Sequence, residues 1–279
     1  MEKILKGNKI AKKIKKELKQ KIAKLKIKPG LAIILVGQNK ASNVYVKIKE
    51  KACKEIGIYF ELFTFKKEKT ILVLEKKIIT LIKNLNKRLD IHGILVQLPL
   101  PAELNTNKII KTINPKKDVD GFHPQNIKNK IIISPVFKAI IEFLKIIPTS
   151  NLKQKKVLII AKNKIFTEPL KFLLKKLKLN IAIYFYSKNY KIQELKKISQ
   201  QADILIIAIG KPKFITADMV KKDAVVIDIG YNLIKNKSVG DVDFENVFKK
   251  IRFITPVPGG IGPLTVAFLL ENCYEIAIK

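Results

Sequence analysis

A tyrosine and a lysine four residues apart, Tyr45 and Lys49, could carry out acid–base chemistry. Side chains at this spacing share one face of a helix, so the ring and the amine would lie side by side. Neighbouring lysines and burial would lower the pKa of the Lys49 amine toward neutral pH and let it exchange a proton. Because such pairs are also common on helix surfaces, an ordinary amphipathic helix is the alternative interpretation.

An amide and two carboxylates follow at positions where they could act together with a lysine. Gln97 comes directly after the apolar run 91–96 and before a proline-rich turn, so it lies where a strand ends and could accept a hydrogen bond from an amine. Asp118 and Asp120 precede Gly121. These carboxylates could bind a polar ligand or form an Asx turn, and the residues alone leave both possibilities open.

Prolines and glycines are concentrated in residues 255–265, which hold three of the chain's twelve prolines and three of its twelve glycines. Proline fixes the path of such a loop, and glycine lets a ligand approach the backbone closely. The segment therefore predicts the wall of a binding site, with a tight structural turn as the alternative. The residues expected to form this wall are Pro258, Gly259, Gly260, Gly262 and Pro263.

Apolar strand-like runs alternate with amphipathic helical runs along almost the whole chain, which is typical of parallel α/β layers. The first half predicts helices at 8–25, 43–56, 71–86 and 105–113, the second of them with Ser42 as N-cap, and strands at 31–36, 59–65 and 91–96. The second half predicts strands at 157–160, 181–186, 204–209 and 225–229 and helices at 169–177 and 192–200. Helices at 137–147 and 265–278 complete the pattern.

The fold class is therefore predicted to be α/β with two lobes. The first domain would be residues 1–121, completed by the closing helix 265–279, and residues 122–150 would form a linker and an inter-lobe helix. Residues 151–264 would form a doubly wound, Rossmann-type parallel sheet, in which ligands bind beyond the carboxyl ends of the strands. The active site is expected in the cleft between the two lobes.

The formal net charge of +33 could indicate a nucleic-acid-binding protein. Arg88 and Arg252 are the only arginines, however, and a protein that reads bases and phosphates is expected to use the planar arginine fork. We therefore interpret the lysines as solvated surface residues whose positive field would attract small polyanions. The chain shows no signal peptide and no apolar run long enough to span a bilayer, so we expect no membrane partner and a cytoplasmic location.

The two cysteines, Cys53 and Cys273, are expected to be free thiols. Neither lies at a metal-ligand spacing from the two histidines, His92 and His123, so no metal site is predicted. The histidines are expected to be loop and turn residues because neither belongs to a nucleophile or metal pattern.

Six segments, in this order along nearly the whole chain, resemble those of the bifunctional methylenetetrahydrofolate dehydrogenase and methenyltetrahydrofolate cyclohydrolase family. Each string is a weak signal alone, but the six together at fitting spacings are specific. The segments are Ser42 to Lys49, Val96 to Leu100, Lys117 to Gly121, Val226 to Asn232, Gly240 to Val242 and Thr255 to Pro263.

The resemblance implies a two-step enzyme of one-carbon metabolism and purine biosynthesis. The first step would pass a hydride from 5,10-methylenetetrahydrofolate to NADP, and water would then open the methenyl product to 10-formyltetrahydrofolate. The resemblance implies that Lys49 is the catalytic lysine, Tyr45 packs on the folate, Gln97 positions the lysine and Asp120 hydrogen-bonds the pterin ring. It adds Leu98, Asp118 and the loop residues named above to the folate site, and it implies a homodimer.

For the cofactor, the resemblance implies a site at the carboxyl ends of the second lobe's strands. The residues assigned to it are Ala161, Lys162, Asn163, Ser187, Gly210, Pro212, Asp228, Gly230 and Asn232. Ser187 and Lys188 suit the 2′-phosphate of NADP, and no acidic residue stands there to favour NAD.

The chain departs from the family at two places in its second half. The loop after 157–160 lacks the family's glycines, which puts close approach to the cofactor phosphates in doubt, and Lys162 cannot offer a bidentate fork. A family Pro-Cys-Thr-Pro loop appears as Pro135 to Lys138, which removes a hydroxyl. We therefore keep two alternatives to the bifunctional enzyme, namely a cyclohydrolase with a weakened dehydrogenase half and, more remotely, a basic nucleic-acid-binding protein on the same scaffold.

Overall fold

The structure is a computed structural model that describes residues 3–66, 68, 70–129, 131–147, 155–235 and 237–279. The chain divides into two compact units. We call Ile10–Lys138 with Thr265–Lys279 the three-stranded unit, and Met1–Lys9 with Ala139–Leu264 the five-stranded unit. Each boundary falls within a helix, namely α1 (Gly7–Ala23), α6 (Pro135–Ile146) or α10 (Ile261–Ala277).

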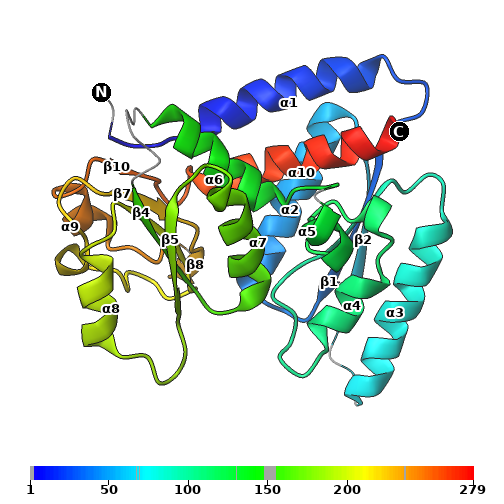
Figure 1. Cartoon of the computed structure of the whole chain (residues 1–279). Helices are drawn as coiled ribbons and strands as arrows, with labels where there is room; N and C mark the ends of the chain where they lie inside the picture. Colours follow the sequence, from blue (N-terminus) through cyan, green and yellow to red (C-terminus); the bar gives the residue numbers. More distant parts are fainter. Residues whose placement is uncertain (1–2, 67, 69, 130, 148–154, 236) are drawn as a thin grey trace. The chain divides into compact units, whose positions relative to one another are not determined.

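The sheet of the three-stranded unit is entirely parallel (Figure 1). Its central strand β1 (Gly30–Val36) pairs with β2 (Tyr59–Phe65) on one side and with β3 (Gly93–Val96) on the other. Every residue of β1 and β3 is buried, which explains why both appear in the sequence as uninterrupted apolar runs. Because the strands are parallel, the residues that follow β1 and β3 lie at the same edge of the sheet.

Helices cover both faces of this sheet. One hydrophobic cluster joins β1 to α1, α2 (Lys40–Ile56) and α10, and a second joins β1 and β3 to α3 (Ile71–Lys87) and α4 (Thr106–Thr112). Leu31, Ile33 and Leu35 of β1 belong to the first cluster, whereas the intervening residues belong to the second. This alternation follows from the two-residue period of a strand, and it fixes α2 on one face. The short helices η1 (Pro115–Lys117) and α5 (Pro124–Asn129) follow α4.

The five-stranded unit contains a second parallel sheet with the strand order β10-β7-β6-β4-β5. The sequence order turns at β4, which has β5 on one side and β6 on the other, so the sheet is doubly wound as predicted. The strands are β4 (Lys156–Ala161), β5 (Asn180–Phe185), β6 (Ile204–Ala208), β7 (Val225–Asp228) and β10 (Phe253–Ile254).

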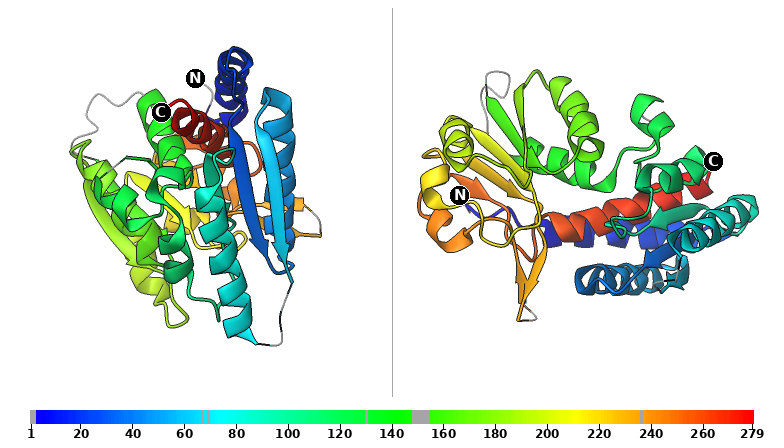
Figure 2. Two further views of the ribbon diagram at one scale, coloured as in Figure 1. Left: turned by 90° about the vertical axis from the view of Figure 1, so that its right-hand side faces the viewer. Right: turned by 90° about the horizontal axis from the view of Figure 1, so that it is seen from below.

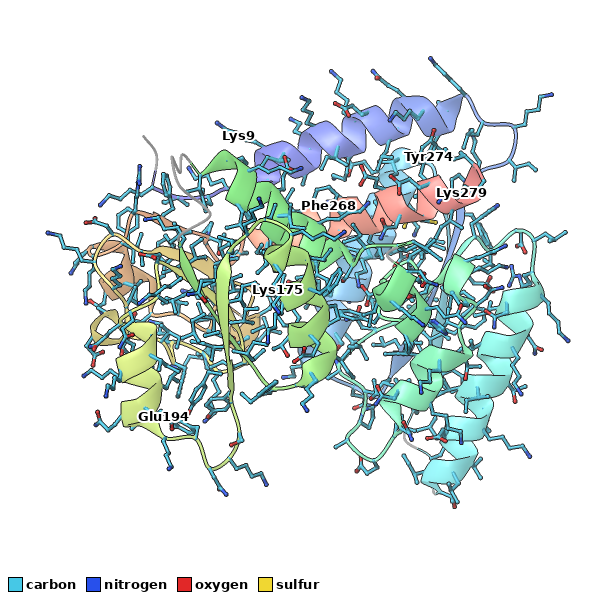
Figure 3. All side chains as sticks on the ribbon, in the orientation of Figure 1. Lys9, Lys175, Glu194, Phe268, Tyr274 and Lys279 are labelled. Carbon is cyan, nitrogen blue, oxygen red and sulfur yellow. The ribbon has the colours of Figure 1, made fainter. Side chains whose placement is uncertain are left out.

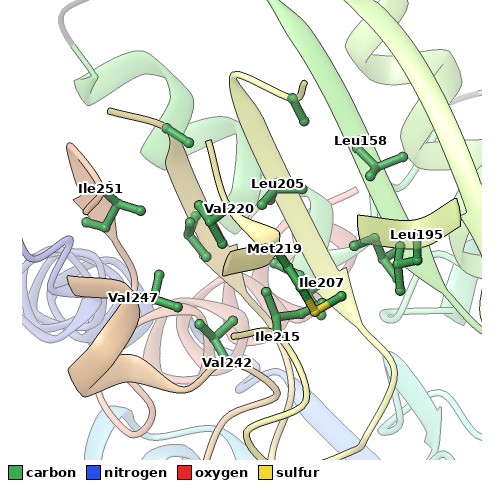
Figure 4. Close-up of a cluster of buried hydrophobic side chains, with 14 of the residues drawn as sticks. Leu158, Leu195, Leu205, Ile207, Ile215, Met219, Val220, Val242, Val247 and Ile251 are labelled. Atoms are coloured by element: carbon green, nitrogen blue, oxygen red, sulfur yellow. The ribbon is translucent and has the colours of Figure 1, made fainter. Parts of the chain in front are cut away.

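Helices α7 (Lys164–Lys175), α8 (Ile192–Ser199) and α9 (Phe244–Phe248) and the short helix η3 (Ala217–Met219) accompany this sheet. Figure 4 shows the cluster in which Leu205 and Ile207 of β6 meet Leu195 of α8, Met219 of η3 and Val247 of α9. A hairpin of β8 (Asn232–Ile234) and β9 (Lys237–Val239) extends away from the sheet, as the right-hand view of Figure 2 shows.

The N-terminal residues belong to the five-stranded unit, whereas we predicted residues 1–121 to form one domain. Ile4 bridges to Ile254 of β10 in parallel, and the Leu5 N–H donates to the Ile254 carbonyl at 2.8 Å. The Gly7 N–H donates to the Gly259 carbonyl, also at 2.8 Å. A pairing between residues about 250 positions apart leaves no local pattern in the sequence, which explains the difference.

Two helices begin earlier than predicted because asparagines cap them. The side chain of Asn39 accepts from the Ser42 N–H at 3.0 Å, so α2 begins at Lys40 and Asn39, not Ser42, is the N-cap. Asn163 accepts in the same way from the Phe166 N–H at 3.1 Å, so α7 begins at Lys164 and contains Pro169 instead of starting there.

The proline- and glycine-rich segment is shorter than predicted because α10 begins at Ile261. Gly262 and Pro263 therefore belong to the first turn of this helix, where a missing backbone N–H costs nothing. The elements that we did not predict are α5, α9, η1, η3 and the β8–β9 hairpin. Their strands have three residues and their helices have three to six, which is too short to show a periodicity.

Lysine side chains cover much of the surface. Those of Lys9, Lys12, Lys16 and Lys19 on α1 are exposed, and Figure 3 shows nitrogen-tipped side chains projecting from this helix. Within the described residues, no helix is both long enough and apolar enough to cross a membrane.

The contact of Gly7 with the 255–260 loop predicts that this position accepts no side chain. A Cβ on Gly7 would lie 2.0 Å from the Gly260 carbonyl oxygen, which is backbone and cannot rotate away. We expect Gly7→Ala to lower the free energy of unfolding by about 1 to 3 kcal/mol, the usual cost of overpacking, in a denaturant titration. Lys9→Ala, at an exposed position two residues away, is the control and should change it by less than about 0.5 kcal/mol. Equal stability of the two variants would contradict the prediction.

Candidate active site

The lysine identified in the sequence is buried. Lys49 lies on the face of α2 that packs against β1, between the core residues Val46 and Cys53, and only 6% of its surface is exposed. Among the residues that the structure describes, it is the only lysine in the buried class. Its Nζ donates a hydrogen bond to Oε1 of Gln97 at 2.8 Å, which joins two residues that are 48 positions apart.

Gln97 is held firmly where β3 ends. Its backbone N–H donates to the Ile34 carbonyl of β1 at 2.9 Å, and its side-chain Nε2 donates to the Leu98 carbonyl at 2.8 Å. Because Nε2 is engaged, the amide oxygen faces the lysine. The structure therefore supports the prediction that this amide accepts a hydrogen bond from the amine.

Two opposing effects act on the pKa of the Lys49 amine. Burial lowers the pKa of the Lys49 amine below its ordinary value of 10.5, and the nearby carboxylate of Asp120 opposes this shift. Burial in turn raises the pKa of Asp120 to about 6, which the Lys49 ammonium counteracts and Asp118 reinforces. The two groups therefore form one coupled acid–base pair, in which burial favours the neutral form of each group and the charge of each favours the charged form of the other.

Tyr45 lies one turn before Lys49 on α2 and is half-buried. Its ring is thus on the same side of the helix as the amine, as the spacing predicted. Leu98, which follows Gln97, packs against the second core cluster of the unit. The three-stranded unit therefore contains Tyr45, Lys49, Gln97, Leu98 and Asp120 together.

Asp118 differs from Asp120 because its carboxylate is fully used within the protein. Only 1% of Asp118 is exposed, and its oxygens accept from the Gly121 N–H at 3.1 Å, the His123 N–H at 2.8 Å and the Asn126 side chain at 3.0 Å. The first of these bonds is the Asx-type turn that we considered from the sequence. Burial raises the pKa of Asp118, and these three donors lower it. The network fixes the backbone on either side of Asp120.

The histidines have structural contacts, in line with their predicted positions in loops and turns. Nδ1 of His92 accepts from the Gly30 N–H at 3.0 Å, and Nδ1 of His123 accepts from the Gln125 N–H at 3.1 Å. Cys53 and Cys273 are free and buried, and burial raises the pKa of the Cys53 thiol to about 12. In the described part of the chain, no group of three or more His, Cys, Asp or Glu side chains is placed to hold a metal ion.

The Pro258–Gly260 loop belongs to the five-stranded unit. The Gly260 N–H donates to the Pro256 carbonyl at 2.9 Å, and Gly259 has a φ of 105°, a conformation that favours glycine. Thr255, just before the loop, accepts from the Asp228 N–H at 2.7 Å and thereby ties the loop to β7.

The candidate cofactor residues lie where the strands of the five-stranded sheet end. Ala161 is the last residue of β4, and its side chain is buried with 1% exposure. Lys162 is exposed, and Asn163 caps α7, so a lysine lies next to the positive amino-terminal end of this helix. Ser187 is exposed two residues after β5. The helix start and these polar groups fit the phosphates of a dinucleotide.

A buried pair of carboxylates organises the ends of β6 and β7. Asp241 is fully buried and accepts from the backbone N–H groups of Ile209, Gly210 and Lys211 at 2.7 to 2.9 Å. It also accepts from the side chain of Asn232 at 2.9 Å. The loop that carries Gly210 and Pro212 is therefore held by one carboxylate.

Asp228 is the second carboxylate of this pair. It is 3% exposed and accepts from the N–H groups of Gly230, Asp241 and Val242. Burial and the neighbouring Asp241 raise the pKa of Asp228 to about 7, whereas these three donors lower it. The sequence analysis assigned Asp228 to the cofactor site. It gave Asp241 no role, although Asp241 lies in the segment Gly240 to Val242, which is one of the six that resemble the family.

Both halves of the chain are similar to domains of known proteins. Residues 5–120 match the family model described as the tetrahydrofolate dehydrogenase/cyclohydrolase catalytic domain, and residues 135–279 match the NAD(P)-binding domain of the same family. The bifunctional protein FolD of Thermodesulfovibrio yellowstonii is 45% identical over 98% of this chain and 96% of its own length. The protein of the same name from Bacillus cytotoxicus is 44% identical over the same shares.

Solved structures of similar proteins cover nearly the whole chain. The FolD methylenetetrahydrofolate dehydrogenase/cyclohydrolase of Campylobacter jejuni is 38% identical, with a TM-score of 0.86 over 99% of this chain and 98% of its own. The Trypanosoma brucei enzyme, solved with NADP and an inhibitor, is 30% identical, with a TM-score of 0.87 over 99% and 97% of the two chains.

The different environments of Asp118 and Asp120 predict different effects of the same substitution. In Asp118→Asn an amide NH₂ would replace an oxygen that faces N–H donors, so a buried donor would lose its partner. We expect this variant to lose about 1 to 3 kcal/mol of unfolding free energy in a denaturant titration. Asp120→Asn is the matched control, and its loss of unfolding free energy should be below about 1 kcal/mol, because burial already disfavours the negative charge of this carboxylate. A larger loss for Asp120→Asn than for Asp118→Asn would contradict this assignment.

Proposed function

The chain belongs to the tetrahydrofolate dehydrogenase/cyclohydrolase family, and we propose that it catalyses both reactions of that name. It oxidises 5,10-methylenetetrahydrofolate to 5,10-methenyltetrahydrofolate with NADP and then hydrolyses the product to 10-formyltetrahydrofolate. The observation that carries this proposal is the buried Lys49 amine, hydrogen-bonded at 2.8 Å to Gln97 and coupled to Asp120.

For the hydrolysis, we assign Lys49 as the proton-transfer group. The neutral Lys49 amine accepts a proton from water while the water oxygen bonds to the methenyl carbon. The resulting ammonium then returns a proton to the ring nitrogen that leaves as the carbon–nitrogen bond breaks, and the hydroxyl group releases its proton to solvent as it becomes the formyl carbonyl. Burial supports this role because it lowers the pKa of the amine, and proton transfer of this kind contributes roughly 10² to 10⁴ in rate.

The remaining residues of the three-stranded unit are assigned to orientation and binding. Gln97 holds Lys49 in place through its amide oxygen, and Tyr45 packs against the folate. Asp120 hydrogen-bonds the pterin ring, and Asp118 acts indirectly by fixing the backbone beside it. Leu98 and the Pro258, Gly259, Gly260, Gly262 and Pro263 segment are proposed to complete the folate site.

The nucleotide-binding half retains the groups that NADP requires. When bound, NADP accepts the hydride from the one-carbon bridge of the folate. We assign Lys162, Asn163 and Ser187 to its phosphates and Gly210, Pro212, Asp228, Gly230 and Asn232 to the loops that line its site. The absence of an acidic side chain directly after β5 favours NADP over NAD.

The missing glycine at position 161 does not prevent this role. Asn163 has a φ of −148°, and the positive-φ residues of the described chain do not include Ala161 or Lys162. The turn from β4 into α7 therefore needs no glycine conformation, and the methyl group of Ala161 is buried in the core. Relatives named as bifunctional align with 98% of the chain, which likewise favours two activities over a cyclohydrolase alone.

We further propose that residues 1–121 with 265–279 bind the folate and that residues 151–264 bind NADP. We also propose that the protein acts as a cytoplasmic homodimer that supplies purine biosynthesis.

One assay of the purified protein tests both activities. Purified protein should form the methenyl compound from 5,10-methylenetetrahydrofolate only when NADP is present, and it should hydrolyse supplied methenyl compound without any nucleotide. Hydrolysis without NADP-dependent oxidation would instead establish the cyclohydrolase-only alternative.

The role of Lys49 predicts the effect of removing its amine. We expect Lys49→Met to reduce hydrolysis of supplied methenyl compound by roughly 10² to 10⁴ while the protein still folds and binds NADP. The matched control is Lys51→Met, which removes the same charge from an exposed position of the same helix and should keep its activity. Near-wild-type hydrolysis by Lys49→Met would refute the assignment.

The coupling of Lys49 and Asp120 predicts a shift in the pH dependence of hydrolysis. Activity should fall at acidic pH because Lys49 must be neutral to accept a proton from water. The Asp120 carboxylate raises the pKa of Lys49, so Asp120→Asn should lower that pKa further. The acidic limb of the kcat/KM profile should therefore move to lower pH in Asp120→Asn, even where the absolute rate is reduced. If hydrolysis instead needed the protonated amine, activity would be lost on the basic side, and that basic limb would move to lower pH in Asp120→Asn.

A further inference from the structure

Three aromatic rings hold the amine of Lys211 in the five-stranded unit. Its Nζ lies 5.0 Å from the ring centroid of Tyr186, 5.5 Å from that of Tyr190 and 5.7 Å from that of Phe214. The three rings also contact one another, with centroids 4.7 to 5.3 Å apart. We call Tyr186, Tyr190 and Phe214 the aromatic cage. It restrains a side chain that would otherwise sample many rotamers.

The cage leaves the amine charged and open to solvent. Lys211 is exposed, and its hydrogen bond with Tyr186 raises the pKa of the amine. No ion pair joins Lys162, Lys188 or Lys211 to a carboxylate in the part of the chain that the structure describes. The caged ammonium is therefore available to an anion from outside.

The position of the cage links it to the end of β5. Strands β5, β4 and β6 are neighbours in the sheet, Tyr186 directly follows β5, and Lys211 comes three residues after β6. A Cβ on Gly210 would lie 3.7 Å from Nζ of Lys162, which follows β4. Residues that follow these three adjacent strands thus bring cations to one edge, next to the exposed hydroxyl of Ser187.

This edge is where a doubly wound sheet distinguishes its two nicotinamide cofactors. The end of the second strand binds the ribose, and a cation there accommodates a 2′-phosphate. We propose that Lys211, held by the aromatic cage, is a specificity-determining residue that binds the 2′-phosphate of NADP and selects it over NAD. The inference rests on the proposed use of NADP and extends it to a residue to which we had given no role.

The cage explains how a chain with almost no arginine could perform this task. Arg88 and Arg252, the only arginines, both lie outside the strand ends that carry the cage. Arginine brings a planar, pre-organised fork to a phosphate, whereas lysine is a point charge on a flexible stem. The three rings around the Lys211 amine would supply this pre-organisation, because the lysine side chain then loses less conformational entropy when a phosphate binds.

The test compares nucleotides that differ only in the 2′-phosphate. Wild type and Lys211→Met are titrated calorimetrically with NADP and NAD, and also with the fragments 2′,5′-ADP and 5′-AMP. We expect Lys211→Met to weaken binding of NADP and 2′,5′-ADP by about tenfold or more, as the loss of a charged hydrogen bond does, and to change NAD and 5′-AMP binding less than twofold. Lys213→Met removes an exposed charge from the same loop and should leave all four affinities unchanged.

A second variant tests the cage separately from the charge. Tyr190→Leu opens the cage but keeps Lys211, so it should weaken NADP by less than Lys211→Met does and should leave NAD unchanged. Equal loss of NADP and NAD in Lys211→Met would show that the cage serves the adenosine moiety, and no loss would show that it serves only the fold. Either result overturns the inference, and the proposed function stands if wild-type oxidation with NADP is intact. If the wild type binds neither nucleotide, the proposed function itself fails.

Discussion

The proposed chemistry of this protein depends on taking one ammonium group out of water. Lysines cover the surface of the chain, yet Lys49 is placed in the core of the three-stranded unit with 6% of its surface exposed. Burial disfavours its charge, Asp120 favours it, and Gln97 accepts its hydrogen bond. Because α2 packs on β1 and Gln97 lies at the end of β3, the position of the amine depends on the order of strands in this small sheet.

The five-stranded unit also buries charged groups, but there they are negative. Asp228 and Asp241 are buried together, and two carboxylates in the core are tolerated only if donors surround them. Their donors are mostly backbone N–H groups of the loops that follow β6 and β7, so satisfying the charges also fixes the loops. The close approach leaves no room for side chains, since a Cβ on Gly240 would lie 1.9 Å from Asp228 Oδ2.

Local patterns predicted much of this structure. Continuous apolar runs located β1, β4 and β6 to within one or two residues, because buried parallel strands need no alternation. The position of Gln97 after a strand indicated that its amide could accept a hydrogen bond from an amine, and the family resemblance implied that Lys49 is its partner. The sequence prediction missed the capping asparagines, because it placed the N-cap of one helix at Ser42 and began another helix at Pro169. The pairing of residues 4–7 with β10 and the donors around Asp241 could not be foreseen, since both join segments far apart in the sequence.

The loss of arginine and glycine from the nucleotide-binding half need not mean loss of function. A glycine is indispensable only where the backbone requires positive φ or where a side chain would enter the ligand's space. At Ala161 neither condition holds, because the methyl group points into the core and the turn into α7 is made by Asn163. An arginine is indispensable only where nothing else orders the cation. The rings around Lys211 provide such order, so drift toward lysine is compatible with a site that still discriminates between cofactors.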